Sequence, residues 1–309
     1  MSLIVLVLLL LGTVTHLAAA TPGPSRVAGL RANVPLPTLG GLQWWGDVAL
    51  WPDWRIQQHA VTGHARVLDR RGMRRAWGSL AACRAFVDAR DPQAFTGELV
   101  LFLHGLGRTR HQWTALSADV RAVGFTPVPI SWPSTREDVP QAATRLRLLI
   151  QQLSADHAVT GLRFVTHSQG GILLRFAMAE PVPRMPPLRS VVFCFPPHQG
   201  AHLADLVARW RWPLLLLGPG ILRVTHAGAR SLPSWQHGSA LVIAGGRGDG
   251  HGLNPWIPGD DDGIVAVADT TLTGSPTVVL PVNHTFGVRD PGLRHTVLDW
   301  LQRETPTEP

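Results

Sequence analysis

The stretch Phe164-Val165-Thr166-His167-Ser168-Gln169-Gly170-Gly171 decides which fold we expect for this chain. It predicts the end of an apolar strand, a serine among small residues and the start of a helix. A serine in such a sharp turn projects its hydroxyl at the carboxyl edge of a sheet, and the strained, closely packed backbone needs small flanking residues. Thr166 departs from the G-x-S-x-G pattern of this turn, because it stands in the place of the first glycine. The stretch therefore predicts Ser168 as a nucleophile.

Apolar runs and helix-like segments alternate on both sides of this turn. The predicted strands are residues 99–103, 127–130, 162–165, 190–195, 240–244 and 277–280, and the predicted helices are residues 112–123, 139–153, 171–179 and 293–301. Strands that are apolar throughout and separated by helices are typical of a parallel sheet covered on both faces. We therefore predict an α/β fold with a mostly parallel central sheet and helices on both faces.

The composition indicates a folded protein and argues against nucleic-acid binding. The chain has 309 residues, of which 45% are hydrophobic, and this is enough for a sizeable buried core. Its formal net charge is +7, but a nucleic-acid-binding surface needs that charge gathered on one face. The only dense basic run is Arg70, Arg71, Arg74 and Arg75, in a predicted turn after a strand. We expect no nucleic-acid partner.

The N-terminal segment predicts contact with a membrane. Residues 2–21 carry no charge, and residues 3–11 are almost purely aliphatic. Residues 1–21 are therefore predicted to be a signal peptide or an N-terminal membrane anchor. No basic residue precedes the apolar run, which is unusual for a signal peptide, and the first charges, Arg26 and Arg31, follow it. In either case we expect the protein at the cell envelope, exported or membrane-anchored.

The remaining chain divides into a linker, a body and a tail. Residues 22–41, rich in Pro and Gly, predict an exposed linker, residues 42–303 the folded domain, and residues 304–309 a tail. Within the domain, residues 54–70 predict a hairpin with its turn at Thr62-Gly63, and residues 77–89 predict a helix. Two cysteines, Cys83 and Cys194, do not make a disulfide framework, and either two buried thiols or a single bridge remains open.

An insert interrupts the alternation of strands and helices. Residues 198–238 contain no clean strand, and residues 210–222 are densely apolar. Such a segment is expected to bury itself. It predicts either a helix packed on the domain or a cap-like lid over an acyl-binding cleft.

The stretch Phe102-Leu103-His104-Gly105-Leu106-Gly107 follows an apolar strand and precedes a helix. This is the place of an oxyanion-hole loop relative to the predicted nucleophile. Two aimed backbone N–H groups stabilise the negative charge that develops on oxygen during acyl transfer. We assign the two donors to the backbone of Leu106 and of Gln169.

A general base is expected after the last strand. Residues 279–286 follow the final predicted strand and place His284 in a loop at the carboxyl end of the sheet, within reach of Ser168. His295 also follows the last strand, but it falls inside the final predicted helix. We therefore predict His284 as the base.

The acid that orients this imidazole is expected between the serine and the histidine in the chain. Residues 259–265 offer three aspartates, and we choose Asp262, which directly precedes Gly-Ile-Val. Asp260 and Asp261 are expected to be solvated or to hold a stray cation, although their spacing does not follow a metal-binding loop. Asp249 is a weaker alternative for the acid.

These motifs together resemble bacterial α/β-hydrolases of the lipase and esterase type. The resemblance covers residues 99–301. It extends to Phe195-Pro196-Pro197-His198-Gln199-Gly200-Ala201 with Leu203-Ala204-Asp205, which is similar to a Pro-x-x-Gly-Ser segment of such lipases. Residues 262–265 and 284–286 are similar to their acid and histidine loops.

The resemblance implies a serine hydrolase that cleaves carboxylic esters through an acyl-enzyme, with Ser168, His284 and Asp262 as its triad and with neither cofactor nor metal. The apolar insert and the N-terminal segment favour a lipid or long-acyl ester as the substrate. An acyltransferase or thioesterase would use the same triad with another acceptor. A membrane-tethered binding protein that keeps the fold without turnover also remains open.

Overall fold

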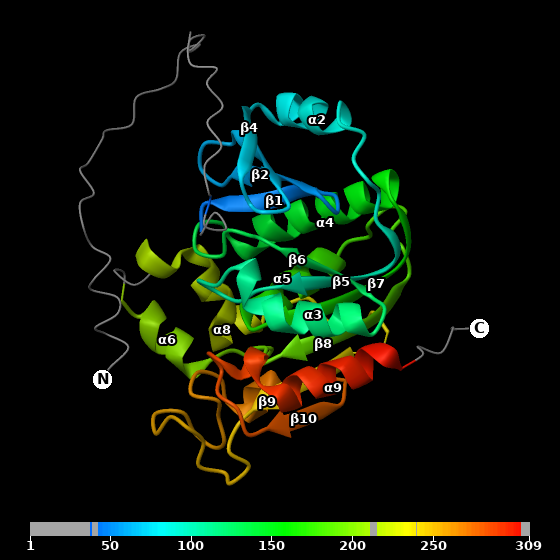
Figure 1. The fold of residues 1–309 in the computed structure, drawn as a ribbon. Coiled ribbons are helices and arrows are strands. Elements are labelled where there is room, and N and C mark those ends of the chain that lie inside the picture. Colours follow the sequence, from blue (N-terminus) through cyan, green and yellow to red (C-terminus); the bar gives the residue numbers. More distant parts are fainter. Residues whose placement is uncertain (1–37, 39–42, 211–214, 239, 304–309) are drawn as a thin grey trace. The chain divides into compact units, whose positions relative to one another are not determined.

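A six-stranded parallel sheet forms the middle layer of the computed structural model, which describes residues 38, 43–210, 215–238 and 240–303 (Figure 1). Every neighbouring pair in it is parallel, and the order is β10-β9-β8-β7-β5-β6. The strands are β5 (Thr96–Leu103), β6 (Thr126–Ile130), β7 (Ala158–His167), β8 (Leu188–Cys194), β9 (Ala240–Gly245) and β10 (Thr277–Leu280). The predicted parallel sheet is confirmed.

Helices cover both faces of this sheet. On one side lie α4 (Val139–Asp156) and α5 (Gln169–Met178), and on the other lie α3 (Thr114–Ala122) and α9 (Pro291–Gln302) (Figure 1). Strand β5 shows why its sequence is apolar throughout. Leu101 packs in the core beside α4 and α5, whereas Phe102 packs in the core beside α3 and α9. Successive side chains of a strand point to opposite faces, and here both faces are buried.

A second sheet, which the sequence predicted only in part, precedes the parallel one. It is antiparallel, with the order β1-β2-β3-β4, and α2 packs on it. Its elements are β1 (Trp45–Leu50), β2 (Trp54–His59), β3 (Ala65–Asp69), β4 (Arg74–Gly78) and α2 (Leu80–Asp88). The predicted hairpin is β2 and β3. The placement of Arg74 and Arg75 in a turn was wrong, because both lie in β4.

The helices begin at residues that local chemistry explains. Asp290 caps α9 by accepting hydrogen bonds from the N–H groups of Gly292 and Leu293. Ser79 caps α2 in the same way, so this helix begins at Leu80 and not at residue 77. A 3-10 turn, η2 (Arg110–Trp113), precedes α3. Each predicted helix is therefore present with shifted ends.

The two cysteines are buried and unbonded. Cys83 lies in α2 and Cys194 at the end of β8. Burial raises the pKa of the Cys83 thiol to about 11 and raises that of Cys194 further, so both are neutral thiols at pH 7. The alternative of a bridge between them is wrong.

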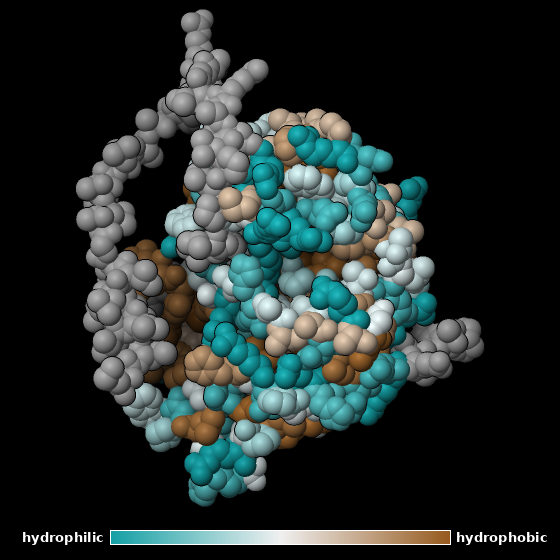
Figure 2. Space-filling model, viewed as in Figure 1, coloured by the Kyte–Doolittle hydropathy of each residue, from teal (hydrophilic) through white to brown (hydrophobic). Residues whose placement is uncertain are grey.

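The insert, residues 198–238, contains helical turns and no strand among its described residues. They include α6 (His202–Ala208), η3 (Pro219–Val224) and α8 (His226–Ala229). Ile221 and Val224 are buried in the core beside α5, but Trp210 is 60% exposed and Leu215 is 77% exposed. Figure 2 shows hydrophobic surface over this part of the molecule. The expectation that the whole apolar run is buried was wrong, and its role as a lid stays a prediction.

Several sequence predictions fall outside the described residues. These are the N-terminal segment 1–21, the tail 304–309 and all of the linker 22–41 except Thr38. The hydroxyl of Thr38 donates a hydrogen bond to the carbonyl oxygen of Gly72 at 2.9 Å. Among the residues that are described, no helix has both the length and the apolar character needed to cross a membrane.

Candidate active site

Ser168 sits in a strained turn between β7 and α5. Its φ is 52° and its ψ is −123°, a backbone conformation that non-glycine residues seldom adopt. The turn is held because the N–H of Ser168 donates a hydrogen bond to the carbonyl oxygen of Cys194 at 2.9 Å. The serine therefore stands at the carboxyl end of the parallel sheet, as the strand-to-helix motif predicted.

Close packing explains the small residues around this serine. A Cβ atom on Gly170 would lie 2.5 Å from the carbonyl oxygen of Leu103, so the helix can approach β5 only with glycine there. A Cβ on Gly171 would lie 3.2 Å from the hydroxyl of Thr166. That hydroxyl is buried and donates to the carbonyl oxygen of Val192 at 3.4 Å. The missing side chain of Gly171 thus leaves room for threonine in place of the first motif glycine.

The strand order places this turn where neighbouring strands of the sheet send their connections in opposite directions. The chain leaves β5 towards β6 on one side, and it then returns to form β7 on the other side of β5. The loops that follow β5 and β7 therefore diverge from a topological switch point, where ligands of open α/β sheets bind. Leu106 lies in the first of these loops and Ser168 in the second.

The structure brings Ser168, His284 and Asp262 together in one hydrogen-bonded chain. Nε2 of His284 lies 2.9 Å from Oγ of Ser168, and Nδ1 of His284 lies 2.7 Å from Oδ2 of Asp262. His284 and Asp262 are both buried. The three residues come from different loops, separated by 94 and 22 positions in the sequence, as their numbers show.

The hydrogen bonds define the tautomer of His284. The carboxylate of Asp262 can only accept, so the proton of the imidazole lies on Nδ1 and the lone pair on Nε2 faces the serine hydroxyl. The other oxygen of Asp262 accepts from the N–H groups of Ile264 and Val265 at 3.0 and 2.8 Å. The N–H of His284 also donates to the carbonyl oxygen of Asp262 at 2.8 Å. This arrangement can take a proton from Ser168.

The competing candidates for the acid lie elsewhere. Asp260 accepts from the N–H of Arg247 at 2.7 Å and Asp261 from the N–H of Gly263 at 2.6 Å. Asp261 is fully buried, so the expectation that it is solvated was wrong. Asp249 is exposed and forms an ion pair with Arg247 at 3.0 Å.

The competing base also lies apart from Ser168. His295 is on α9, 77% exposed, and pairs with Asp299 at 3.4 Å.

The predicted oxyanion loop lies directly against Ser168. A Cβ on Gly105 would lie 3.1 Å from the Cβ of Ser168, so only glycine fits there. The next N–H group, that of Leu106, makes no hydrogen bond to any described residue. The N–H of Gln169 belongs to the first turn of α5 and has no acceptor within the helix. Both groups are thus available to an oxygen atom beside the serine, and their role stays a prediction.

Two buried histidines support the site, and the sequence motifs gave them no role. His167 donates its Nε2–H to the carbonyl oxygen of His284 at 3.1 Å. Burial, and then the neighbouring His284, hold the pKa of His167 well below its usual value. His104 donates to the carbonyl oxygen of Gly105 at 2.9 Å, and Nε2 accepts from the N–H of Trp132 at 3.3 Å. Burial lowers the pKa of His104 to about 4.

Long-range hydrogen bonds also hold the loop after β5. The guanidinium of Arg108 donates to the carbonyl oxygen of Thr285, directly after His284, at 2.9 Å. The N–H of Gly107 donates to the hydroxyl of Ser134 at 2.9 Å, and that hydroxyl donates to the side-chain oxygen of Gln43 at 2.7 Å. These partners are far apart in the chain, so no local signal could reveal them.

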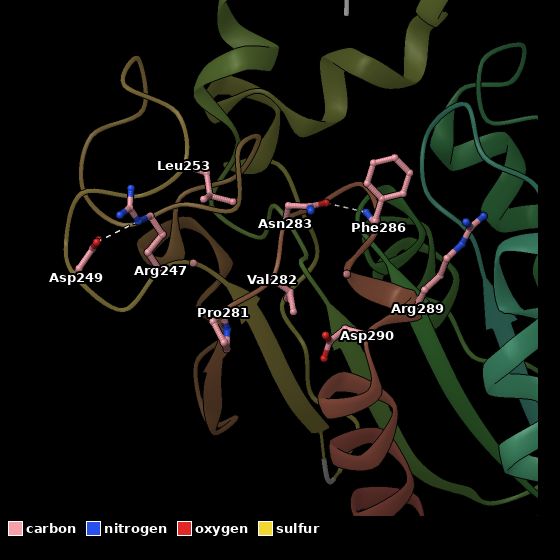
Figure 3. Close-up of a pocket in the computed structure, with 11 residues that line it drawn as sticks. Arg247, Asp249, Leu253, Pro281, Val282, Asn283, Phe286, Arg289 and Asp290 are labelled. Carbon is pink, nitrogen blue, oxygen red and sulfur yellow. Dashed lines mark hydrogen bonds and ion pairs between the residues drawn. The ribbon is translucent and has the colours of Figure 1, made fainter. Parts of the chain in front are cut away.

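A cavity of about 670 Å³ opens beside the histidine loop (Figure 3). Asn283 and Phe286, on either side of His284, line it together with Leu253. The side-chain oxygen of Asn283 accepts from the N–H of Phe286 at 2.8 Å. Neither Ser168 nor His284 lines this cavity. It is therefore adjacent to the candidate site and not part of it.

The sheet and the serine turn define the class of fold. A parallel sheet covered by helices on both faces, with a serine between strand and helix at its carboxyl edge, is the α/β-hydrolase fold of lipases and esterases. The fold that the sequence predicted is thereby confirmed. One fold hosts many acyl transfers, so the fold alone does not define the substrate.

Solved structures share this fold at low sequence identity. The mature form of the Bacillus licheniformis lipase BlEst2 matches with a TM-score of 0.54 and 19% identity, over 65% of this chain and 90% of that chain. The Legionella pneumophila phospholipase PlaB, in complex with thio-NAD, matches with a TM-score of 0.52 and 16% identity, over 68% of this chain and 59% of that one. The match thus spans less than two thirds of PlaB. No protein-family model and no curated protein matches the chain.

Proposed function

We propose that this protein is a serine hydrolase that cleaves carboxylic esters. The observation that carries the proposal is the hydrogen-bonded chain from Ser168 through His284 to Asp262, at 2.9 and 2.7 Å. A nucleophile and a base within hydrogen-bond reach, with the base oriented by a third group, are what acyl transfer through a serine requires. The lipase and esterase fold supports the same reaction class.

In the proposed mechanism, Nε2 of His284 takes the proton of Ser168 while Oγ attacks the ester carbonyl. The negative charge on the carbonyl oxygen is stabilised by the N–H groups of Leu106 and Gln169. The leaving alcohol then receives the proton from His284, and the acyl group remains on Ser168. A water molecule, deprotonated by His284, attacks the acyl-enzyme and releases the acid. Asp262 keeps the proton on Nδ1 and stabilises the imidazolium.

The proposed substrates are lipid or long-acyl esters. Exposed apolar side chains support this choice, because Phe286, in the histidine loop, is 59% exposed and Trp256 is 78% exposed. Leu215 and Leu216 of the insert are also exposed. Apolar groups left in solvent favour contact with an apolar ligand or surface. Two structures with the same fold are described as a lipase and a phospholipase.

We further propose that the protein is located at the cell envelope, exported or anchored through residues 1–21. The uncharged, aliphatic composition of this segment supports the proposal. Mass spectrometry of the mature N-terminus tests it. Cleavage after the apolar run would indicate export, retention of the run in a membrane fraction would indicate an anchor, and an intact chain in the soluble cytoplasm would contradict both.

A fluorophosphonate probe, which reacts with activated serines, tests the proposed reaction. We expect the full chain to be labelled and Ser168→Ala to be unlabelled, with hydrolysis of fluorogenic esters lowered at least about 10⁴-fold. Esters of graded chain length then test the substrate class, and turnover should rise towards long acyl chains. Equal turnover by wild type and Ser168→Ala would refute the mechanism. Transfer of the acyl group to an added alcohol or thiol in preference to water would make the protein an acyltransferase.

A further inference from the structure

Four side chains of types that ligate metals in proteins meet at the insert, and none of them belongs to the chain of hydrogen bonds from Ser168 to Asp262. His202 and Asp205 lie in α6, His226 in α8, and Asp269 in η4 (Val267–Thr270). Donor atoms of His202, Asp205 and His226 lie within 4.8 Å of one another. The rings of His202 and His226 are 4.6 Å apart between centroids. Three segments of the chain thus converge on one point.

Asp205 orients the imidazole of His226. Its Oδ2 lies 2.5 Å from Nδ1 of His226, and its Oδ1 accepts from the backbone N–H of the same residue at 3.0 Å. In the neutral imidazole the carboxylate therefore keeps the proton on Nδ1 and leaves the lone pair on Nε2. When one ring nitrogen of a histidine binds a metal, the other commonly donates its N–H to a carboxylate in this way.

Nε2 of His226 faces the carboxylate of Asp269. Oδ1 of Asp269 lies 3.4 Å from Nε2 of His226, and Oδ2 of Asp269 lies 3.8 Å from Nε2 of His202. Two ligands of a tetrahedral zinc ion, bound at roughly 2.0–2.1 Å, are about 3.4 Å apart. Each histidine is therefore within about 0.4 Å of this separation from one oxygen of Asp269, through a different oxygen for each ring.

An unpaired carboxylate oxygen of Asp269 is an independent indication of a bound ligand. Its Oδ2 is buried and has no hydrogen-bond partner among the described residues. A buried carboxylate oxygen without a donor is costly unless a cation or a proton compensates it. The backbone of Asp269 is held in place, because its carbonyl oxygen accepts from the N–H of Gln199 at 2.8 Å. The carboxylate thus stays directed at the two histidines.

We propose that His202, His226 and Asp269 bind a divalent transition-metal cation of the Zn²⁺ class, with Asp205 as the outer carboxylate. Two imidazoles and one carboxylate suit Zn²⁺, whereas Ca²⁺ takes six to eight oxygen ligands. Two neutral imidazoles and two carboxylates give the cluster a formal charge of −2, which a divalent cation neutralises. This proposal differs from the expectation, made from the sequence, that the protein binds no metal.

The metal would join two separate helices of the insert, α6 and α8, to η4 of the body of the protein. His202 lies near the start of residues 198–238, and His226 lies in their second half. Asp269 belongs to η4, a few residues after Asp262 and its loop. Bound metal therefore stabilises the insert against local unfolding without taking part in the reaction at Ser168.

A proton on His226, shared between Asp205 and Asp269, is the rival explanation of the cluster. Burial lowers the pKa of His226, but the hydrogen bond from Asp205 and the charges of both carboxylates outweigh it and leave this pKa above its usual value. His202 separates the two explanations. It is a ligand of the metal, but it lies outside the proton-bridged pair of carboxylates around His226.

The test is calorimetric titration of the chelator-treated full chain with ZnCl₂. We expect one Zn²⁺ per chain, a rise in Tm on binding, and at least about 100-fold weaker binding by His202→Ala and by Asp269→Asn. Asp205→Asn should weaken binding about 10–100-fold, as expected for an outer partner. His295→Ala, which removes another surface histidine that is paired with an aspartate, is the matched control and should bind Zn²⁺ as wild type does.

Two further measurements keep the test independent of folding and of the proposed esterase activity. Circular dichroism of each variant must match wild type without metal, and His202 is partly exposed, so its replacement is compatible with folding. Co²⁺ added in place of Zn²⁺ should give the visible absorption bands of a tetrahedral site in wild type and lose them in His202→Ala. Zn²⁺ binding unchanged in His202→Ala, no Zn²⁺ binding by wild type, or preference for Ca²⁺ would each overturn the proposal.

Discussion

The side chain of His167 donates a hydrogen bond from Nε2 to the backbone carbonyl oxygen of His284, at 3.1 Å. His167 directly precedes Ser168 in the chain. Its side chain thus holds the loop of His284, the residue whose imidazole faces Ser168. The low pKa of His167 keeps its ring neutral at pH 7, and the carbonyl acceptor places the single ring proton on Nε2. We therefore expect His167 to position the imidazole of His284.

Loss of this bond should slow turnover without weakening substrate binding. We expect His167→Phe to lower kcat about 10–100-fold with KM nearly unchanged, because a small displacement of His284 spoils the approach to Ser168. His167→Gln keeps a donor and should recover part of the loss. Steady-state kinetics on a soluble ester measure both parameters. A purely structural role would predict that Phe and Gln behave alike, or that KM changes as much as kcat.

Asp262→Asn should lower kcat by on the order of 10³–10⁴ with the fold intact. An amide cannot accept on both sides as the carboxylate does, so the tautomer of His284 with its lone pair towards Ser168 is lost. Asp249→Asn is the matched control, since Asp249 is exposed and pairs with Arg247 and His251 of its own loop. It should retain nearly full activity. Comparable losses in the two variants would remove Asp262 from its assigned role.

Gly170→Ala should destabilise the whole domain. The added Cβ would lie 2.5 Å from the carbonyl oxygen of Leu103, and neither backbone can move without separating α5 from β5. We expect a loss of about 2–4 kcal/mol in the free energy of unfolding. At Gly124, φ is +94° but nothing lies within 4 Å of the added atom, so Gly124→Ala should cost only about 1 kcal/mol. Urea denaturation of both variants gives the comparison, which fails if the two costs are equal.

Stability should fall as the pH is lowered from 7 to 5. His104, His167 and His198 are buried with pKa values below the usual 6.5, chiefly because burial disfavours their charged forms. Below pH 6.5 the unfolded chain binds protons that the folded chain does not, so stability is present above this pH and decreases below it. Each such histidine contributes up to about 1.4 kcal/mol per pH unit.

Urea denaturation at pH 7 and pH 5 measures this dependence. His198→Gln removes one of the three groups and should reduce the difference in stability between the two pH values. His295→Ala removes an exposed histidine and should leave that difference as it is in wild type. Equal pH dependence in wild type and His198→Gln would show that His198 is not held neutral by burial.

The sequence predicted the features that have a local cause. The apolar runs around Phe102 and Phe164 correspond to strands because both faces of the sheet are buried. The small residues beside Ser168 predicted its turn because that backbone has no room for side chains. By contrast, β4 escaped prediction, because its consecutive arginines, Arg74 and Arg75, follow closely on Arg71 and Gly72 and resemble a charged turn. Leu215 is exposed, although the sequence predicted that its apolar segment is buried. An apolar segment indicates that contact with another apolar surface is favourable, but not that the same domain provides this surface.

The sequence by itself therefore determined the α/β-hydrolase fold and placed Ser168 at the carboxyl edge of the sheet, since strand, turn and helix depend on neighbouring residues. Only the tertiary structure decided which aspartate faces His284, what His167 holds, and that His202, His226 and Asp269 meet. These relationships join residues far apart in the chain. Such contacts depend on how distant loops pack against each other, and no spacing or periodicity in the sequence records that packing.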